Sequence, residues 1–276
     1  MTPFGERLTA ALAARGPLCV GIDPHDSLLR EWGLDVDLAG LERFSRTCVD
    51  ALSGEVAVVK PQSAFFERFG SGGIAVLERV IADARSAGAL LIVDAKRGDI
   101  GSTMTAYATA YCDPSSSLAG DAVTVAPYVG FGALAPLLDA ARAHGSCVLV
   151  LAATSNPEGA AVQRAAGADG RSVAQTIIDQ AAAANAHSVG PLGFVGVVVG
   201  ATLGELDLDL AALAGPILVP GLGAQGGTPG DIKRLFGTLP GVLPSTSRGV
   251  LAAGPSPKNL RAAARRQVDA LRDAGL

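Results

Sequence analysis

Charged and aromatic residues are scarce in this chain of 276 residues, at 17% and 4% of its composition. A formal net charge of −4 lacks the basic excess that nucleic-acid binders carry, so no nucleic-acid partner is expected. No apolar run reaches the roughly 18 to 20 residues of a membrane-spanning helix. The first residues also lack the pattern of a secretory leader. We therefore expect a cytoplasmic protein that acts on a small molecule, with no membrane partner.

The usual patterns of metal and disulfide sites are missing too. The four cysteines are widely spaced and form no CxxC pair, which argues against a zinc site or a disulfide framework. The three histidines are isolated and show no HExxH-type spacing. No bound metal is therefore expected.

What the sequence does contain is a series of short, strongly apolar runs that resemble buried parallel strands. Their starts lie 22 to 48 residues apart, which is too long for hairpins and suits a strand followed by a crossover helix. The eight predicted strands are Leu18–Ile22, Val56–Lys60, Leu90–Asp94, Ala122–Val125, Cys147–Leu151, Val195–Val199, Ile217–Pro220 and Val242–Ser245.

Between these runs the apolar period changes to that of a helix, as in Leu38, Leu41, Phe44, Cys48 and Leu52. Eight strand–helix units predict an α/β fold, a single-domain (β/α)8 TIM barrel over residues 1–276. An open doubly wound sheet is the alternative. The longest interval, after the fifth strand, predicts an insertion at about residues 156–194.

In such barrels the active site lies at the carboxyl ends of the strands. The polar or loop residues expected there, in chain order, are Asp23, Lys60, Asp94 with Lys96, Pro127, Ser155, Gly200, Gln225 and Arg248.

The strongest local signal is the stretch from Asp94 to Asp99. Asp94 and Lys96 are two apart, so in an extended strand both side chains point to one side, toward the barrel mouth. Surface ion pairs are an ordinary alternative explanation for one such pair. The apolar second strand, however, also ends in a charge, Lys60, and the first is followed by Asp23. Converging charges of both signs favour a preorganised active site.

Glycines follow the predicted seventh strand, and Arg248 follows the eighth. Backbone N–H groups in a glycine-rich loop, together with a guanidinium group, suit a phosphate group. Gly221, Gly223 and Gly226 also match GxGxxG, but no acidic residue follows at the distance expected for a dinucleotide site. A purely structural turn is the other alternative. The polar residues around Ser155 are either a turn or a contact to a base or sugar.

Together these features resemble the orotidine 5′-phosphate decarboxylase family. The stretch from Val93 to Thr103, together with Thr154 to Pro157 and the longer chain, resembles its bacterial subgroup of the mycobacterial type. The resemblance covers nearly the whole barrel. It is carried by a DxKxxD element and three further charged residues: Asp94, Lys96 and Asp99, with Lys60, Asp23 and Arg248.

The resemblance implies decarboxylation of orotidine 5′-monophosphate without a metal or organic cofactor. It implies that Lys96 protonates C6 of the pyrimidine and that Asp94 lies beside the departing carboxylate. Lys60 belongs to the same charged chain and binds the ribose. The resemblance also implies a homodimer in which Asp99 reaches the site of the partner subunit.

The remaining implied residues bind the substrate. Asp23 binds ribose hydroxyls, and Thr103 reaches the ribose from the neighbouring subunit. Ser155 recognises the edge of the pyrimidine, and Gln225 with Arg248 holds the phosphate.

Two other functions remain open at this point. Related sugar-phosphate aldolases and decarboxylases use the same barrel with magnesium, but they carry an acidic ligand where this chain has Lys60, which would repel the cation. A non-catalytic barrel that binds a phosphorylated ligand through the loops of Gln225 and Arg248 is the second alternative.

Overall fold

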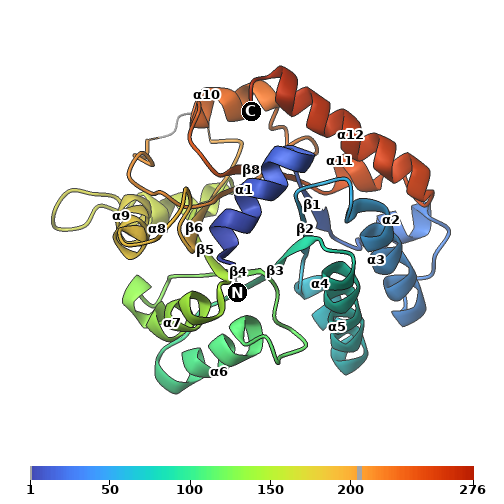
Figure 1. The fold of residues 1–276 in the computed structure, drawn as a ribbon, viewed down its shortest axis with the longest axis horizontal. Coiled ribbons are helices and arrows are strands. Elements are labelled where there is room, and N and C mark those ends of the chain that lie inside the picture. Colours follow the sequence, from blue (N-terminus) through green and yellow to red (C-terminus); the bar gives the residue numbers. More distant parts are fainter. Residues whose placement is uncertain (1, 204–206) are drawn as a thin grey trace.

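Within residues 2–203 and 207–276, which this computed structural model describes, eight parallel strands pair in chain order and close into a barrel (Figure 1). The predicted (β/α)8 barrel is confirmed, and the open sheet is excluded because β1 pairs with both β2 and β8. The strands are β1 (Cys19–Ile22), β2 (Val58–Pro61), β3 (Leu90–Arg97), β4 (Ala122–Val125), β5 (Cys147–Ala153), β6 (Val195–Val199), β7 (Ile217–Pro220) and β8 (Val242–Thr246).

Helices surround the barrel in Figure 1, as the change of apolar period predicts. Their bounds are α1 (Phe4–Arg15), α2 (Asp26–Glu31), α3 (Leu38–Leu52), α4 (Ala64–Glu67), α5 (Gly70–Ser86), α6 (Gly101–Cys112), η1 (Phe131–Leu134), α7 (Ala135–His144), η2 (Pro157–Gly159), α8 (Ala160–Gln163), α9 (Val173–Asn185), α10 (Pro229–Phe236), α11 (Arg248–Leu251) and α12 (Pro257–Asp273).

Between β5 and β6 the chain forms η2, α8 and then α9, which packs against both of these strands. Asn185 at the end of α9 is buried and its side chain exchanges hydrogen bonds with the backbone of Val195 at the start of β6. The longest interval of the chain therefore includes a crossover helix anchored to the barrel.

Alternation along each strand divides the core into an inner and an outer part. On β3, Leu90 and Ile92 belong to the inner cluster, whereas Leu91 and Val93 pack outward against the helices. The same period places the next inward position of β3 at Asp94. A strand that is apolar at its start thus presents a charge inside the barrel at its carboxyl end.

The opposite end of the barrel is closed by α1. Phe4 and Leu8 are buried in the inner cluster, and Arg7 hydrogen-bonds Asp121 and the carbonyl of Gly145, which precede β4 and β5. The carboxyl ends of the strands are therefore the open end. Across the described residues, none of the helices combines the length and apolarity that crossing a bilayer requires.

Candidate active site

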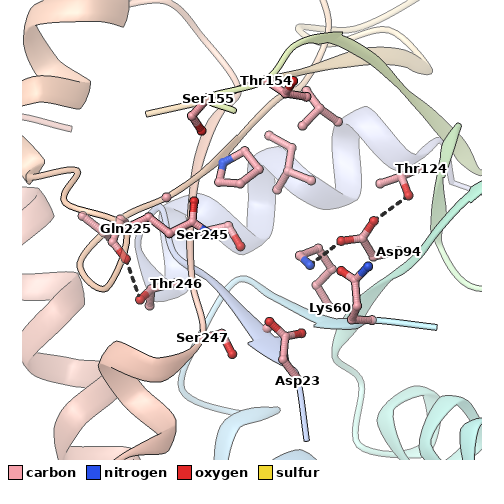
Figure 2. Close-up of a pocket in the computed structure, with 18 of the residues that line it drawn as sticks. Asp23, Lys60, Asp94, Thr124, Thr154, Ser155, Gln225, Ser245, Thr246 and Ser247 are labelled. Carbon is pink, nitrogen blue, oxygen red and sulfur yellow. Dashed lines mark hydrogen bonds and ion pairs between the residues drawn. The ribbon is translucent and has the colours of Figure 1, made fainter. Parts of the chain in front are cut away.

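A cavity of about 290 Å³ opens at the carboxyl ends of the strands. Eight of the nine residues predicted at the strand ends line it: Asp23, Lys60, Asp94, Lys96, Ser155, Gly200, Gln225 and Arg248. Figure 2 shows Lys60 and Asp94 on one side of this cavity and Gln225 with Thr246 on the other. The predicted convergence of the strand ends is thus seen in the structure.

Asp94 lies between two lysines. Its Oδ2 atom is 2.6 Å from Lys60 Nζ, and its Oδ1 atom is 2.6 Å from Lys96 Nζ. The side chains of Lys60 and Asp94 are each 7% exposed, whereas that of Lys96 is 42% exposed. One carboxylate therefore holds a buried ammonium group and a second ammonium group that faces the cavity.

Burial acts to raise the pKa of Asp94, but the ammonium groups of Lys60 and Lys96 outweigh it and hold this pKa below the usual range. Burial likewise acts to lower the pKa of Lys60, but the carboxylates of Asp94 and Asp23 outweigh it and raise this pKa above its ordinary value. Both partners of the buried pair are therefore charged near neutral pH.

The backbone at Lys96 departs from the extended strand that the sequence spacing assumes. Its φ is +50°, in the left-handed region that side chains other than glycine seldom adopt, and the pairing of β3 with β4 shifts register between Val93 and Arg97. The lysine still turns its Nζ toward Asp94. The predicted convergence is thus reached through a bulged backbone.

Two residues that the sequence analysis does not assign complete this cluster. Thr124 on β4 donates to Asp94 Oδ1 at 2.7 Å. With its amide nitrogen toward Asp94, Gln62 donates to Oδ2 at 2.5 Å and accepts from Lys96 Nζ at 3.1 Å. Pro127, the residue expected from the fourth strand, is not among those that line the cavity, and Thr124 lies there instead. Alternation along the strand could have placed Thr124 inside the barrel, but not its contacts with Asp94 and Lys96.

The opposite side of the cavity is built from loops after β7 and β8. Gly221 and Gly223 have φ values of +112° and +81°, which glycine alone adopts without strain. The hydroxyl of Thr246 donates to the carbonyl of Leu222 at 2.9 Å and ties the two loops together. Arg248 also lines the cavity and is exposed, so this end combines a guanidinium group with a glycine-rich backbone, a combination that suits an anion.

Asp23 and Ser155 lie between these two groups. Asp23 lines the cavity, and its buried Oδ1 atom has no hydrogen-bond partner among the described residues. Ser155 follows β5 and packs beside Gly200, where a Cβ atom would come within 2.7 Å of the serine Oγ. The glycine at the end of β6 therefore leaves the room in which this hydroxyl sits.

Asp99 and Thr103 are not among the residues that line the cavity of their own chain. Asp99 Oδ1 accepts a hydrogen bond from the backbone N–H of Ile100, and Thr103 is exposed in the first turn of α6. Asp99 is half-buried, and neither residue contributes to this cavity.

Comparison with known proteins shows the family of the chain. The model of the orotidine 5′-phosphate decarboxylase / HUMPS family matches residues 16–263. The chain belongs to this family. The resemblance seen in the DxKxxD element is thereby confirmed.

The relatives of this chain include several family members from actinobacteria. The orotidine 5′-phosphate decarboxylase of Salinispora arenicola is 63% identical over 267 residues, which cover 96% of each chain. That of Streptomyces coelicolor is 58% identical over the same length. A solved structure from Streptomyces avermitilis superposes with a TM-score of 0.96 at 57% identity and covers 99% of this chain and 96% of its own.

No group of three or more His, Cys, Asp or Glu side chains in the described ranges is arranged to hold a metal ion. At the end of β2, where metal-dependent relatives were expected to carry an acidic ligand, the structure has the ammonium group of Lys60 bound to Asp94.

Proposed function

We propose that this chain converts orotidine 5′-monophosphate to UMP and carbon dioxide without a cofactor, the last step of de novo pyrimidine nucleotide synthesis. The observation that carries the proposal is that one cavity is lined by two different groups. One is the lysine–carboxylate–lysine group, and the other is the glycine-rich loop with Arg248. A nucleotide with a carboxylate on its base and a phosphate on its sugar matches these two ends. The family of the chain supports the same substrate.

In this proposal the phosphate lies at the loops of β7 and β8, where Gln225 and Arg248 hold it. The unpartnered carboxylate oxygen of Asp23 and the ammonium group of Lys60 bind ribose hydroxyls. Ser155 hydrogen-bonds the edge of the pyrimidine. The phosphate binds away from the reacting carbon, and the free energy of this binding is used to hold the base in the correct orientation against Lys96.

The chemical step breaks the bond between C6 and its carboxylate carbon. The electron pair remains on C6 as carbon dioxide leaves, and the ammonium group of Lys96 donates a proton to this carbon. Because the carbanion has no conjugated electron sink, the required barrier reduction lies near the top of the range of about 8 to 23 kcal/mol typical of enzymes. A fixed ammonium group stabilises the developing charge and then supplies the proton.

Asp94 has two roles in the proposed reaction. It holds Lys96 Nζ at 2.6 Å, so that the proton donor is already placed when the substrate binds. Its negative charge also lies beside the substrate carboxylate and repels it in the ground state. The repulsion is weaker in the transition state, because negative charge has moved from the carboxylate to C6. The low pKa of Asp94 keeps this charge in place at neutral pH.

We further propose that the active unit is a homodimer in which Asp99 and Thr103 enter the site of the partner subunit. Both residues lie outside the cavity of their own chain. Three large apolar side chains of the neighbouring loops are strongly exposed, as surfaces between subunits often are. They are Ile100 at 61%, Tyr128 at 84% and Val129 at 49%.

The proposed activity is tested by following the ultraviolet absorbance of orotidine 5′-monophosphate with purified protein in the presence of a chelator. We expect the absorbance change of conversion to UMP, at a rate that added magnesium does not alter. Activity that requires magnesium would favour a metal-dependent relative instead. Tight binding of the nucleotide without turnover would favour a non-catalytic binding protein.

A further inference from the structure

We propose that Thr124 is a positioning residue, which fixes the backbone of Lys96 and the carboxylate of Asp94 in one arrangement through a single hydroxyl group. The inference extends the proposed function, since it concerns how the proton donor of that reaction is held. It rests on the hydrogen bonds of the β3–β4 junction.

The Thr124 hydroxyl joins two parts of the site that lie two residues apart on β3. Its Oγ1 accepts from the backbone N–H of Lys96 at 3.0 Å and donates to Asp94 Oδ1 at 2.7 Å. A hydroxyl has one proton, and an ionised carboxylate only accepts, so the direction of both hydrogen bonds is determined. The chain of donors runs from Lys96 N–H through Thr124 O–H to Asp94.

This hydroxyl acts where the regular ladder between the strands fails. β3 and β4 pair through Val93 and Val123, and the pairing resumes at Arg97 and Val125 after a shift of register. Thr124 lies opposite the interruption. Its side chain therefore provides the acceptor for Lys96 N–H that a regular strand partner would otherwise provide.

The need for such an acceptor follows from the conformation of Lys96. Its φ of +50° is unfavourable for a residue with a Cβ atom, so the surroundings must hold it in place. The same lysine is 42% exposed, and its Nζ bonds only to Asp94 and Gln62 among the described residues. Because the Lys96 side chain has little packing around it, its position depends on the Lys96 backbone and on the Asp94 carboxylate. The Thr124 hydroxyl hydrogen-bonds both.

Thr124 itself is well placed to be rigid. It is 1% exposed, its strand is buried along its whole length, and a β-branched residue has few rotamers. Valine has nearly the same shape and lacks only the hydroxyl. The substitution Thr124→Val therefore removes the hydrogen bonds while it retains most of the packing.

The experiment compares kcat and KM of the wild type with those of Thr124→Val and Thr124→Ser. We expect Thr124→Val to lower kcat by about 10- to 100-fold, the size of effect that a misplaced reacting group produces. KM should change by less than about threefold, because the phosphate and ribose contacts are intact. Thr124→Ser keeps the hydroxyl and should lie within about threefold of the wild-type kcat. A Thr124→Val enzyme as fast as the wild type, or a serine variant as slow as the valine variant, would overturn the proposal.

A matched control is Ser53→Ala. Ser53 is also buried and its hydroxyl also donates one hydrogen bond, at 2.7 Å to the carbonyl of Val49, but it lies at the end of α3 away from the cavity. This variant should keep the wild-type kcat. A loss of kcat equal to that of Thr124→Val would show that any buried hydroxyl has this effect, and the proposal would be wrong.

A second measurement needs no substrate and separates this inference from the proposed function. Amide hydrogen exchange at Lys96 should be at least about tenfold faster in Thr124→Val than in the wild type, because the N–H loses its acceptor. Unchanged exchange overturns the positioning role even if the enzyme is active. Faster exchange supports it even if the wild type does not consume orotidylate, a result that would refute only the proposed function. If the valine variant does not fold, Thr124→Ala takes its place in both measurements.

Discussion

Lys60 Nζ lies 2.6 Å from Asp94 Oδ2, and each of these two side chains is 7% exposed. Moving two charges out of water costs about as much as their attraction returns, so a buried pair of this kind contributes little net stability. The pair matters instead because it fixes the orientation of the Asp94 carboxylate. With Oδ2 held by Lys60, Oδ1 of Asp94 faces Lys96 and the cavity.

Breaking this pair from one side should be costly. We expect Asp94→Asn to lower the free energy of unfolding by about 3 to 5 kcal/mol, because the ammonium group of Lys60 stays buried without its carboxylate. Urea unfolding at neutral pH measures the change. The control is Asp83→Asn, which removes an exposed carboxylate 2.7 Å from Arg46 and should cost less than about 1 kcal/mol. Equal losses in the two variants would contradict the account of the buried pair.

The same pair predicts a pH dependence on the acid side. Because the folded protein lowers the pKa of Asp94, its contribution is complete above the ordinary aspartate pKa of about 3.9 and is lost as the pH falls toward the lowered value. The stability difference between wild type and Asp94→Asn should therefore be constant from about pH 7 to 5 and shrink below about pH 4. Unfolding curves at several pH values provide the test, and a difference that is unchanged at pH 3 would refute the lowered pKa.

Lys96 should matter for turnover far more than for binding. We expect Lys96→Ala to lower kcat by at least about 1,000-fold, since it removes both the proton donor and a charge that stabilises the transition state. Its affinity for UMP should fall by less than about tenfold, because the loops around Arg248 are untouched. Steady-state kinetics and calorimetry measure the two quantities. Normal turnover in this variant would show that the proton comes from another group.

Arg248 should show the opposite pattern. Its guanidinium group has no partner among the described residues and lines the glycine-rich end of the cavity. A charged hydrogen bond to phosphate is worth about 1.5 to 3 kcal/mol, so Arg248→Ala should weaken UMP binding by about 10- to 100-fold. Uridine lacks the phosphate and provides the matched control, because its affinity should not change. An equal loss for both ligands would place the phosphate elsewhere.

The sequence was sufficient to predict the barrel because each strand is a short apolar run with a recognisable end. β4, β6 and β7 have the predicted bounds, and the apolar pattern from Leu38 to Leu52 is α3. Charges at the end of an apolar strand are also conspicuous, which is why Lys60 and Asp94 could be assigned to the site. These predictions needed only local periodicity and the topology rule for barrels.

Thr124 and Gln62 were missed for a physical reason. In the run Ala-Val-Thr-Val, a threonine is an ordinary strand residue, and nothing local shows that it faces a bulge in the neighbouring strand. The left-handed backbone of Lys96 lies at the same interruption of the pairing. Side chains whose role depends on the register between strands become visible only when the strands are placed.

The last prediction concerns the proposed dimer. If Asp99 acts in the site of the partner subunit, Lys96→Ala and Asp99→Asn subunits are each inactive alone but complement each other when mixed. Half of the dimers in an equal, freely exchanging mixture are hybrids, and one of the two sites in each hybrid has both residues intact. The mixture should thus regain about a quarter of the wild-type activity per subunit. Mass spectrometry of the mixed dimers confirms exchange. Complete exchange without recovered activity would refute the proposal that Asp99 acts in the site of the partner subunit. Asp99 would then act within its own chain, although it does not line the cavity there.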